Sequence, residues 1–78
     1  PVDFLGAMAA VGDASCLEAL AAAFHRAMDA GRKVDDWWRV RLTDVFRTIA
    51  AREHVTKRTA AGKRISGKWK DAAGILWG

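Results

Sequence analysis

The chain contains little proline, little cysteine and no tyrosine, and the first two shortages narrow the possible architectures. One proline and one cysteine occur in 78 residues. A single thiol excludes an internal disulfide, which fits a reducing compartment, so we expect a cytoplasmic protein. Because proline interrupts helices, its near absence leaves helices possible along most of the chain.

The sequence also lacks long apolar runs and strand-like alternation. No apolar stretch approaches the roughly 18 residues that indicate a membrane helix, and no charged start followed by an apolar core marks a secretory signal. The chain begins at Pro1 and ends at Trp77-Gly78, and we expect a fragment or a processed chain. We therefore expect an all-α protein with no membrane partner, residues 1–78 forming one helical domain that is part of a longer protein.

Residue patterns of catalytic and metal sites are also missing. His25, His54 and Cys16 are not spaced as metal ligands. There is no Ser-His-Asp order with a nucleophile elbow, and Gly62-Lys63 lacks the spacing of a phosphate-binding loop. Cys16 is either a packed, inert thiol or a nucleophile activated at a helix start. We expect no catalytic residue, no metal, no cofactor and no enzymatic activity.

Two aspartates each precede apolar residues at helical spacing. Asp13 predicts a helix over residues 14–29, and Asp36 predicts a helix over residues 37–52, because aspartate caps the free N–H groups of a first turn. A loop over residues 30–35 would make the two helices antiparallel. One buried cluster between them is expected to contain Leu17, Leu20, Phe24, Trp38, Leu42, Val45, Phe46 and Ile49.

Shorter helices are expected on either side of this pair. The pattern predicts one helix over residues 3–10 and another over residues 57–65, the second capped by Thr56. The last segment, residues 68–78, is either irregular or a short helix over residues 70–76 that Gly74 weakens. The inward residues of the helix over 57–65 are expected to be Ala60, Ala61 and Ile65.

Two segments resemble a known repeat family. Gly12-Asp13-Ala14-Ser15-Cys16-Leu17-Glu18-Ala19-Leu20 resembles the first-helix start of HEAT-like repeats of the PBS lyase type. Asp36-Trp37-Trp38-Arg39-Val40-Arg41 resembles the loop aspartate and Val-Arg that open the second helix of such a repeat. The resemblance covers about residues 11–52. It implies an α-α superhelix of antiparallel helix pairs, so that the chain would be a solenoid fragment of about one repeat with flanking helices.

The same resemblance implies a class of function. Members of the family mostly act as scaffolds for protein–protein contact, some are bilin lyase subunits, and one branch contains alkylpurine DNA glycosylases. No lyase or glycosylase motif is present, so no catalytic residue carries over from the family.

Charge is unevenly distributed along the chain. The net charge is −3 for residues 1–36 and +7 for residues 37–78, which together give +4. Basic side chains around Trp69 suit a nucleic-acid surface, with charge for phosphates and a ring for stacking. Alternatively, Trp69 covers the last helix while the basic stems coat it. The basic cluster contains Arg52, Lys57, Arg58, Lys63, Arg64, Lys68 and Lys70.

Adjacent tryptophans cannot both face one core, because successive helical residues diverge by about 100°. Trp38 continues the apolar stripe of its helix. Trp37 should therefore face the loop over residues 31–34, a neighbouring repeat or a partner, for which an exposed tryptophan is a typical anchor.

We expect a non-enzymatic scaffold that contacts a protein partner. The alternatives are a nucleic-acid-binding module that uses the basic C-terminal surface and a glycosylase-like enzyme. The candidate partner-binding residues are Trp37, Arg52, Lys57, Arg58, Lys63, Arg64, Lys68 and Trp69. A repeat cut from its array also exposes the faces that its neighbours covered, so a homodimer through the terminal helices is expected. Those faces are expected to carry Phe4, Leu5, Trp69, Ile75, Leu76 and Trp77.

Overall fold

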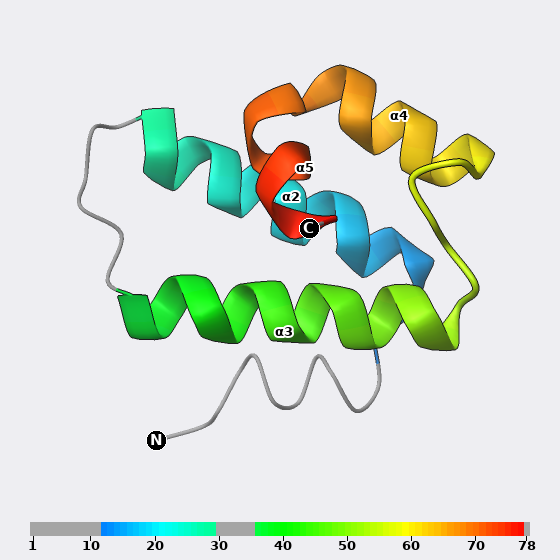
Figure 1. Ribbon diagram of the computed structural model, residues 1–78, viewed down its shortest axis with the longest axis horizontal. Coiled ribbons are helices and arrows are strands. Elements are labelled where there is room, and N and C mark those ends of the chain that lie inside the picture. The colour runs from blue at the N-terminus through cyan, green and yellow to red at the C-terminus, as the bar shows by residue number, and fades with distance from the viewer. Residues whose placement is uncertain (1–11, 30–35, 78) are drawn as a thin grey trace.

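The computed structural model describes residues 12–29 and 36–77, and this part of the chain is helical without strands (Figure 1). Its helices are α2 (Ala14–Asp29), α3 (Asp36–Arg52), α4 (Ala60–Lys68) and α5 (Lys70–Leu76). The prediction of an all-α protein is confirmed for these residues, whereas the helix predicted over residues 3–10 and the loop over 30–35 lie outside them. No helix of the described part is long and apolar enough to cross a membrane.

Helix α2 begins where the sequence predicts, because Asp13 caps it. The Asp13 carboxylate accepts hydrogen bonds from the backbone N–H and the hydroxyl of Ser15, at 3.0 and 2.5 Å. The Ala14 N–H donates to the carboxylate of Glu53 at 3.1 Å. Because Glu53 follows the last turn of α3, this bond fastens the start of α2 to the end of α3.

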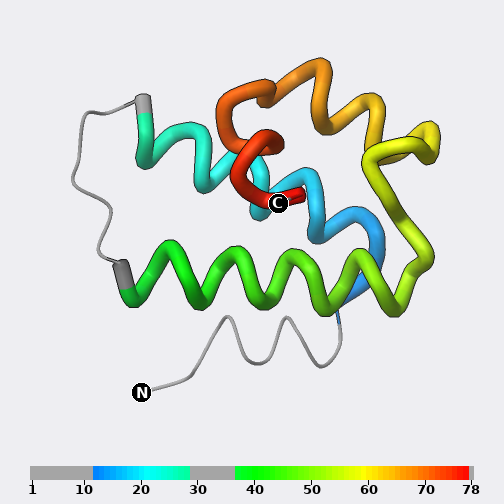
Figure 2. The backbone as a smooth tube through the Cα atoms, in the orientation of Figure 1, coloured from blue at the N-terminus to red at the C-terminus, as the bar shows by residue number. Residues whose placement is uncertain are grey.

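The core lies between α2 and α3, which run antiparallel (Figures 1 and 2). The predicted core residues are all buried except Trp38, which is half-buried with its ring centre 6.0 Å from that of Phe24. The predicted helical hairpin is thus observed. The superhelix that the resemblance implies is not tested by the described residues. The structure adds further buried residues to the predicted core: Ala21, Ala50, Ile65, Ala72, Ala73 and Leu76.

Helix α3 ends in a Schellman motif, with a histidine in the position that glycine usually takes. The N–H of Val55 donates to the Ala50 carbonyl at 2.8 Å, and the N–H of His54 donates to the Ala51 carbonyl at 3.3 Å. His54 has φ of 56°, in the left-handed region. Val55 then packs against the core. This geometry turns the chain out of α3 at the break that the sequence predicts.

The predicted start of the next helix is wrong by one turn. Helix α4 begins at Ala60 rather than residue 57, and its cap is Thr59 rather than Thr56. The Thr59 hydroxyl accepts from the Gly62 N–H at 3.1 Å and donates to the Thr56 carbonyl at 2.8 Å. Residues 56–59 therefore form a turn that precedes the helix instead of its first turn.

The inward face of α4 changes accordingly, and the helix ends later than predicted. Ile65 is buried as expected, but Ala60 is exposed and Gly62 takes the buried position. The helix continues past residue 65 to Lys68.

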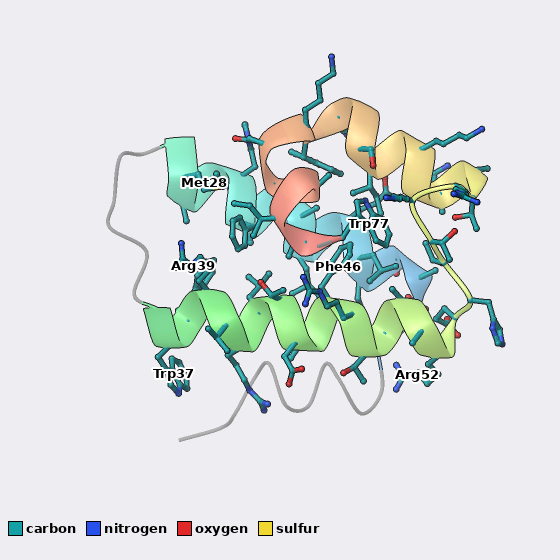
Figure 3. The ribbon with its side chains drawn as sticks, viewed as in Figure 1. Met28, Trp37, Arg39, Phe46, Arg52 and Trp77 are labelled. Atoms are coloured by element: carbon teal, nitrogen blue, oxygen red, sulfur yellow. The ribbon has the colours of Figure 1, made fainter. Side chains whose placement is uncertain are left out.

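Helix α5 completes the core, which corrects the prediction that the C-terminal apolar residues are exposed. It packs against α2, α3 and α4. Leu76 is 0% exposed. The Trp77 ring packs edge to face against the Phe46 ring, with the two ring centres 5.0 Å apart (Figure 3). Trp69 also packs against the core, so Ile75 alone of these C-terminal residues is substantially exposed. The other two residues of that predicted surface, Phe4 and Leu5, lie outside the described part.

Candidate functional site

The predicted basic cluster is not one uniform surface, because several of its members have partners within the protein. Arg64 lies 3.4 Å from Glu18 of α2, in a partly exposed ion pair that contributes little to stability. A guanidinium nitrogen of Arg52 donates to the Gly12 carbonyl, so it helps to hold the start of α2. Two of the candidate arginines therefore connect helices.

Trp69 and Lys68 form a pair of their own. The Lys68 ammonium lies 4.9 Å from the centre of the Trp69 ring, a cation–π arrangement. Trp69 is half-buried and packs against the core. This position fits the alternative in which Trp69 covers the helices, with a lysine stem over its exposed side.

The remaining basic side chains of the cluster have no partner among the described residues. Within the described part, Lys57, Arg58, Lys63 and Lys70 are exposed and make no side-chain hydrogen bond or ion pair. Two of them line one open depression of about 300 Å³ between α4 and α5. We call this depression the α4–α5 groove; it is lined by Lys57, Ser66, Lys70, Ala73, Gly74 and Trp77.

A different surface carries the exposed large hydrophobic side chains of the described residues. Trp37 is 69% exposed, Val40 66% and Ile75 39%. All three line two adjoining depressions, of about 290 and about 330 Å³, that share Val40 and Asp44. Trp37 points away from the helix pair (Figure 3). We call this surface the α3 face; it consists of Trp37, Arg39, Val40, Arg41, Thr43, Asp44, Arg47 and Ile75.

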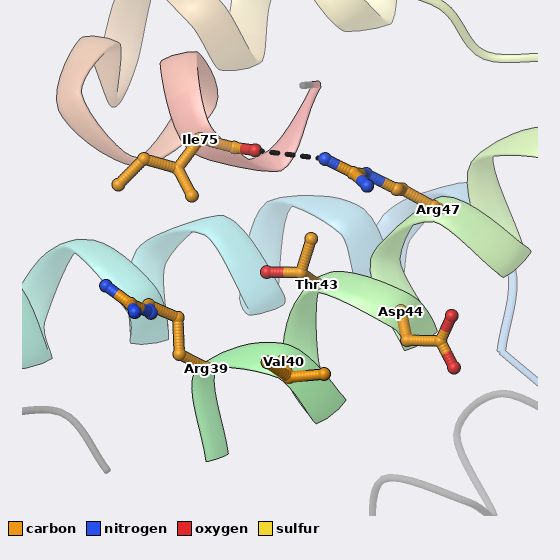
Figure 4. A pocket seen from close by; sticks show the side chains of 6 residues that line it. All are labelled: Arg39, Val40, Thr43, Asp44, Arg47 and Ile75. Carbon is orange, nitrogen blue, oxygen red and sulfur yellow. Dashed lines mark hydrogen bonds between the residues drawn. The ribbon is translucent and has the colours of Figure 1, made fainter. Parts of the chain in front are cut away.

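Arg47 holds the end of α5 at one edge of the α3 face. Its guanidinium donates to the carbonyl oxygen of Leu76 at 3.0 Å. It also donates to the carbonyl oxygen of Ile75 at 3.3 Å (Figure 4). A cation at the end of a helix satisfies the last carbonyls and suits the helix dipole. Ile75 is thereby placed beside the exposed side of α3.

Sequence reasoning identified Trp37 and expected Ile75 on an exposed apolar face, but it missed Val40 and the position of Ile75 beside α3. A signal existed for Val40, because residues 37, 40, 41 and 44 follow the spacing of a second helix face. No comparable signal existed for Ile75, which reaches this face only because α5 folds back onto α3. The predicted alternative that Trp37 covers the loop over residues 31–34 lies outside the described part.

One titratable pair joins α2 to α5. His25 Nδ1 lies 2.9 Å from a carboxylate oxygen of Asp71. The hydrogen bond from His25, followed by one from the backbone N–H of Ala72, holds the pKa of Asp71 below its ordinary value of 3.8. The hydrogen bonds from Ser15 likewise hold the pKa of Asp13 below that value.

These two carboxylates predict a loss of stability in acid. A folded-state pKa that is depressed stabilises the fold above the unfolded pKa, and this contribution is lost as pH falls through the folded pKa. The free energy of unfolding should therefore fall as pH is lowered below about 3.8. Chemical denaturation at a series of pH values measures it.

Asp71→Asn provides the specific test. The variant should show a shallower fall in stability below the same pH, because one of the two carboxylates is gone. Asp44→Asn is the matched control, since the Asp44 side chain makes no hydrogen bond or ion pair within the described part. Identical pH slopes for wild type and Asp71→Asn would contradict the assignment.

The described residues show no arrangement for metal binding. No group of three His, Cys, Asp or Glu side chains lies close enough to hold an ion there. Cys16 is half-buried and packs against the core, the position expected of a structural thiol.

Comparison with known proteins yields no match: no family model, no curated protein and no solved structure matches the chain. Its function must therefore be argued from these surfaces.

Proposed function

We propose that the protein is a non-enzymatic helical module that binds a protein partner through the α3 face. The observation that carries the proposal is that Trp37, Val40 and Ile75 are gathered over two adjoining depressions. Single exposed apolar residues are ordinary, whereas a contiguous group rimmed by polar residues is typical of an interaction site. The resemblance of residues 11–52 to HEAT-like scaffolds supports the same class of function, in a cytoplasmic setting.

The charges around the apolar residues suggest the chemistry of the partner. Arg39, Arg41 and Arg47 border the depressions, and Asp44 is the single acid among the described residues that line them. Complementary charge at the rim steers association and selects partners. We propose a partner segment with a large apolar anchor and acidic flanking residues.

Val40→Asp tests this proposal. Peptides selected from a random library for binding to the wild-type protein should bind the variant at least about tenfold more weakly, because a carboxylate then replaces a central apolar contact and repels acidic flanks. Affinities measured by fluorescence anisotropy give the comparison. The 66% exposure of Val40 makes a large effect on folding unexpected.

Ala19→Asp is the control, because it adds the same charge at an exposed position of α2 that lines neither depression. This variant should bind the selected peptides within about twofold of wild type, as a distant rim charge has little effect on affinity. Peptides that bind Val40→Asp as tightly as wild type would refute the α3 face as the binding surface.

Two further proposals follow from the sequence. Further repeats of the kind that the resemblance implies would extend the α2–α3 pair into a superhelix, and the 78-residue chain by itself would form a homodimer. Burial of Leu76 removes part of the expected dimer surface, so a dimer would use Ile75 and the α3 face. Sedimentation velocity on wild type and Val40→Asp separates a dimer through this face from a monomer.

Nucleic-acid binding is the second candidate function, supported by four exposed cations that have no partner in residues 12–29 and 36–77: Lys57, Arg58, Lys63 and Lys70. Binding of this kind should weaken steeply as salt is raised, because phosphate contacts release counterions. The described residues offer no specific support for the glycosylase-like alternative.

A further inference from the structure

Two lysines from different segments of the chain line the α4–α5 groove. Lys57 lies in the turn before α4 and Lys70 at the first residue of α5, yet both line the same depression of about 300 Å³. Neither side chain makes a hydrogen bond or an ion pair within the described part, and both side chains are exposed. Two lysines that line one depression, with no anion of the described residues paired to them, suit an anionic ligand.

Ser66 and Trp77 add a hydrogen-bonded pair of polar groups to the lining of the groove. The Trp77 indole N–H donates to the Ser66 hydroxyl oxygen at 3.0 Å, so this oxygen already accepts a hydrogen bond. The Ser66 hydroxyl proton makes no hydrogen bond within the described part, and a hydroxyl both donates and accepts. The proton is therefore available to a ligand oxygen, beside an indole ring that Phe46 fixes in place.

Gly74 keeps the groove open. It lines the depression, and a Cβ atom placed on it would meet nothing within 4 Å. Any larger side chain here would project into open space at the lining of the groove, so the absence of a side chain leaves room for a ligand.

We propose that the α4–α5 groove binds a phosphate group, with the ammonium groups of Lys57 and Lys70 neutralising its charge and the Ser66 hydroxyl donating a hydrogen bond. Phosphate provides several acceptor oxygens and at least one negative charge, which match three donors arranged around one depression. The site is separate from the α3 face and does not depend on the protein-binding proposal. The phosphate belongs to either a free phosphorylated small molecule or the backbone of a nucleic acid.

Binding can be followed through Trp77. Its indole N–H resonance, assigned with Trp77→Phe, should shift on titration with inorganic phosphate, with a nucleoside monophosphate and with an oligothymidylate at low salt. Saturation by the monophosphate at a concentration similar to that of the oligonucleotide would identify a small-molecule site. Much tighter binding of the oligonucleotide, with an affinity that depends strongly on salt, would identify a nucleic-acid backbone as the source of the phosphate.

Charge is tested by two matched double variants. Lys57→Gln with Lys70→Gln should weaken binding of each probe by about tenfold or more, because both charged donors are lost. Arg58→Gln with Lys63→Gln removes the same charge from the same stretch, but neither residue lines the groove, so binding of inorganic phosphate and of the monophosphate should fall by less than about threefold, the size of a distant screened effect. Equal losses of monophosphate binding in the two double variants, or no shift with any probe, would overturn the proposal.

Shape is tested without any change of charge. Gly74→Leu should weaken binding by about tenfold, because the added side chain occupies the groove, while leucine favours the helix more than the glycine that it replaces. Gly67→Leu is its control: Gly67 lies on α4, also has open space around a Cβ, and does not line the groove. Full binding by Gly74→Leu would overturn the groove as the site even if the lysines matter.

Discussion

Gly62→Ala is expected to lower the free energy of unfolding by about 3 kcal/mol or more, the upper range for overpacking of a core. A Cβ atom at this position would lie 1.7 Å from the carbonyl oxygen of Thr56 and 2.7 Å from its carbonyl carbon. Both are backbone atoms that no rotamer change can move. Relief requires α4 to separate from the turn over residues 56–59, which would break the Thr59 cap. Urea denaturation measures the loss.

Gly67→Ala makes the same chemical change in the same helix and should act in the opposite direction. Nothing lies within 4 Å of a Cβ at Gly67. Replacing a helical glycine by alanine without a clash should stabilise the protein by up to about 1 kcal/mol. A neutral or stabilising Gly62→Ala would contradict the close approach of the turn to α4.

The bounds of the first two helices could be predicted to within one residue, because their signals are local; α3 begins at Asp36 itself rather than after it. Asp13 caps α2 through Ser15, two residues away, and the apolar stripes of α2 and α3 are long enough to define their buried faces. Almost the whole predicted cluster is buried for this reason.

The start of α4 could not be predicted because two nearby threonines are equally able to cap a helix. Thr56 and Thr59 have the same side chain, and local preference does not distinguish them. The packing of Gly62 against the Thr56 backbone selects the later one, since a helix that began before Thr59 would alter that contact. Selection by tertiary packing leaves no mark in a local pattern.

In the candidate surfaces, too, properties set by neighbouring residues could be predicted and contacts between distant segments could not. The exposure of Trp37 follows from its position beside Trp38 on one helix. By contrast, the partner of Arg64 is Glu18 and that of Arg52 is the Gly12 carbonyl. Both partners are far away in sequence, so spacing could not reveal which basic residues are engaged and which remain available for a ligand.

The second large effect is expected from Leu76→Ala, which should lower the free energy of unfolding by roughly 2–5 kcal/mol. Leu76 is 0% exposed, at the end of a helix that packs against the other three described helices. The substitution removes buried methyl groups and leaves a cavity that Phe46 and its neighbours fill incompletely. Thermal and chemical denaturation measure the loss.

Ile75→Ala is the matched control, because it shortens an adjacent aliphatic side chain that is 39% exposed. It should lower the free energy of unfolding by about 1 kcal/mol or less, since less apolar surface is buried there. A large difference between the two variants means that α5 closes the core, so a second surface could replace α5 only by displacing Leu76. Similar small effects would mean that α5 is loosely attached, and the C-terminal residues would again be available to a second surface.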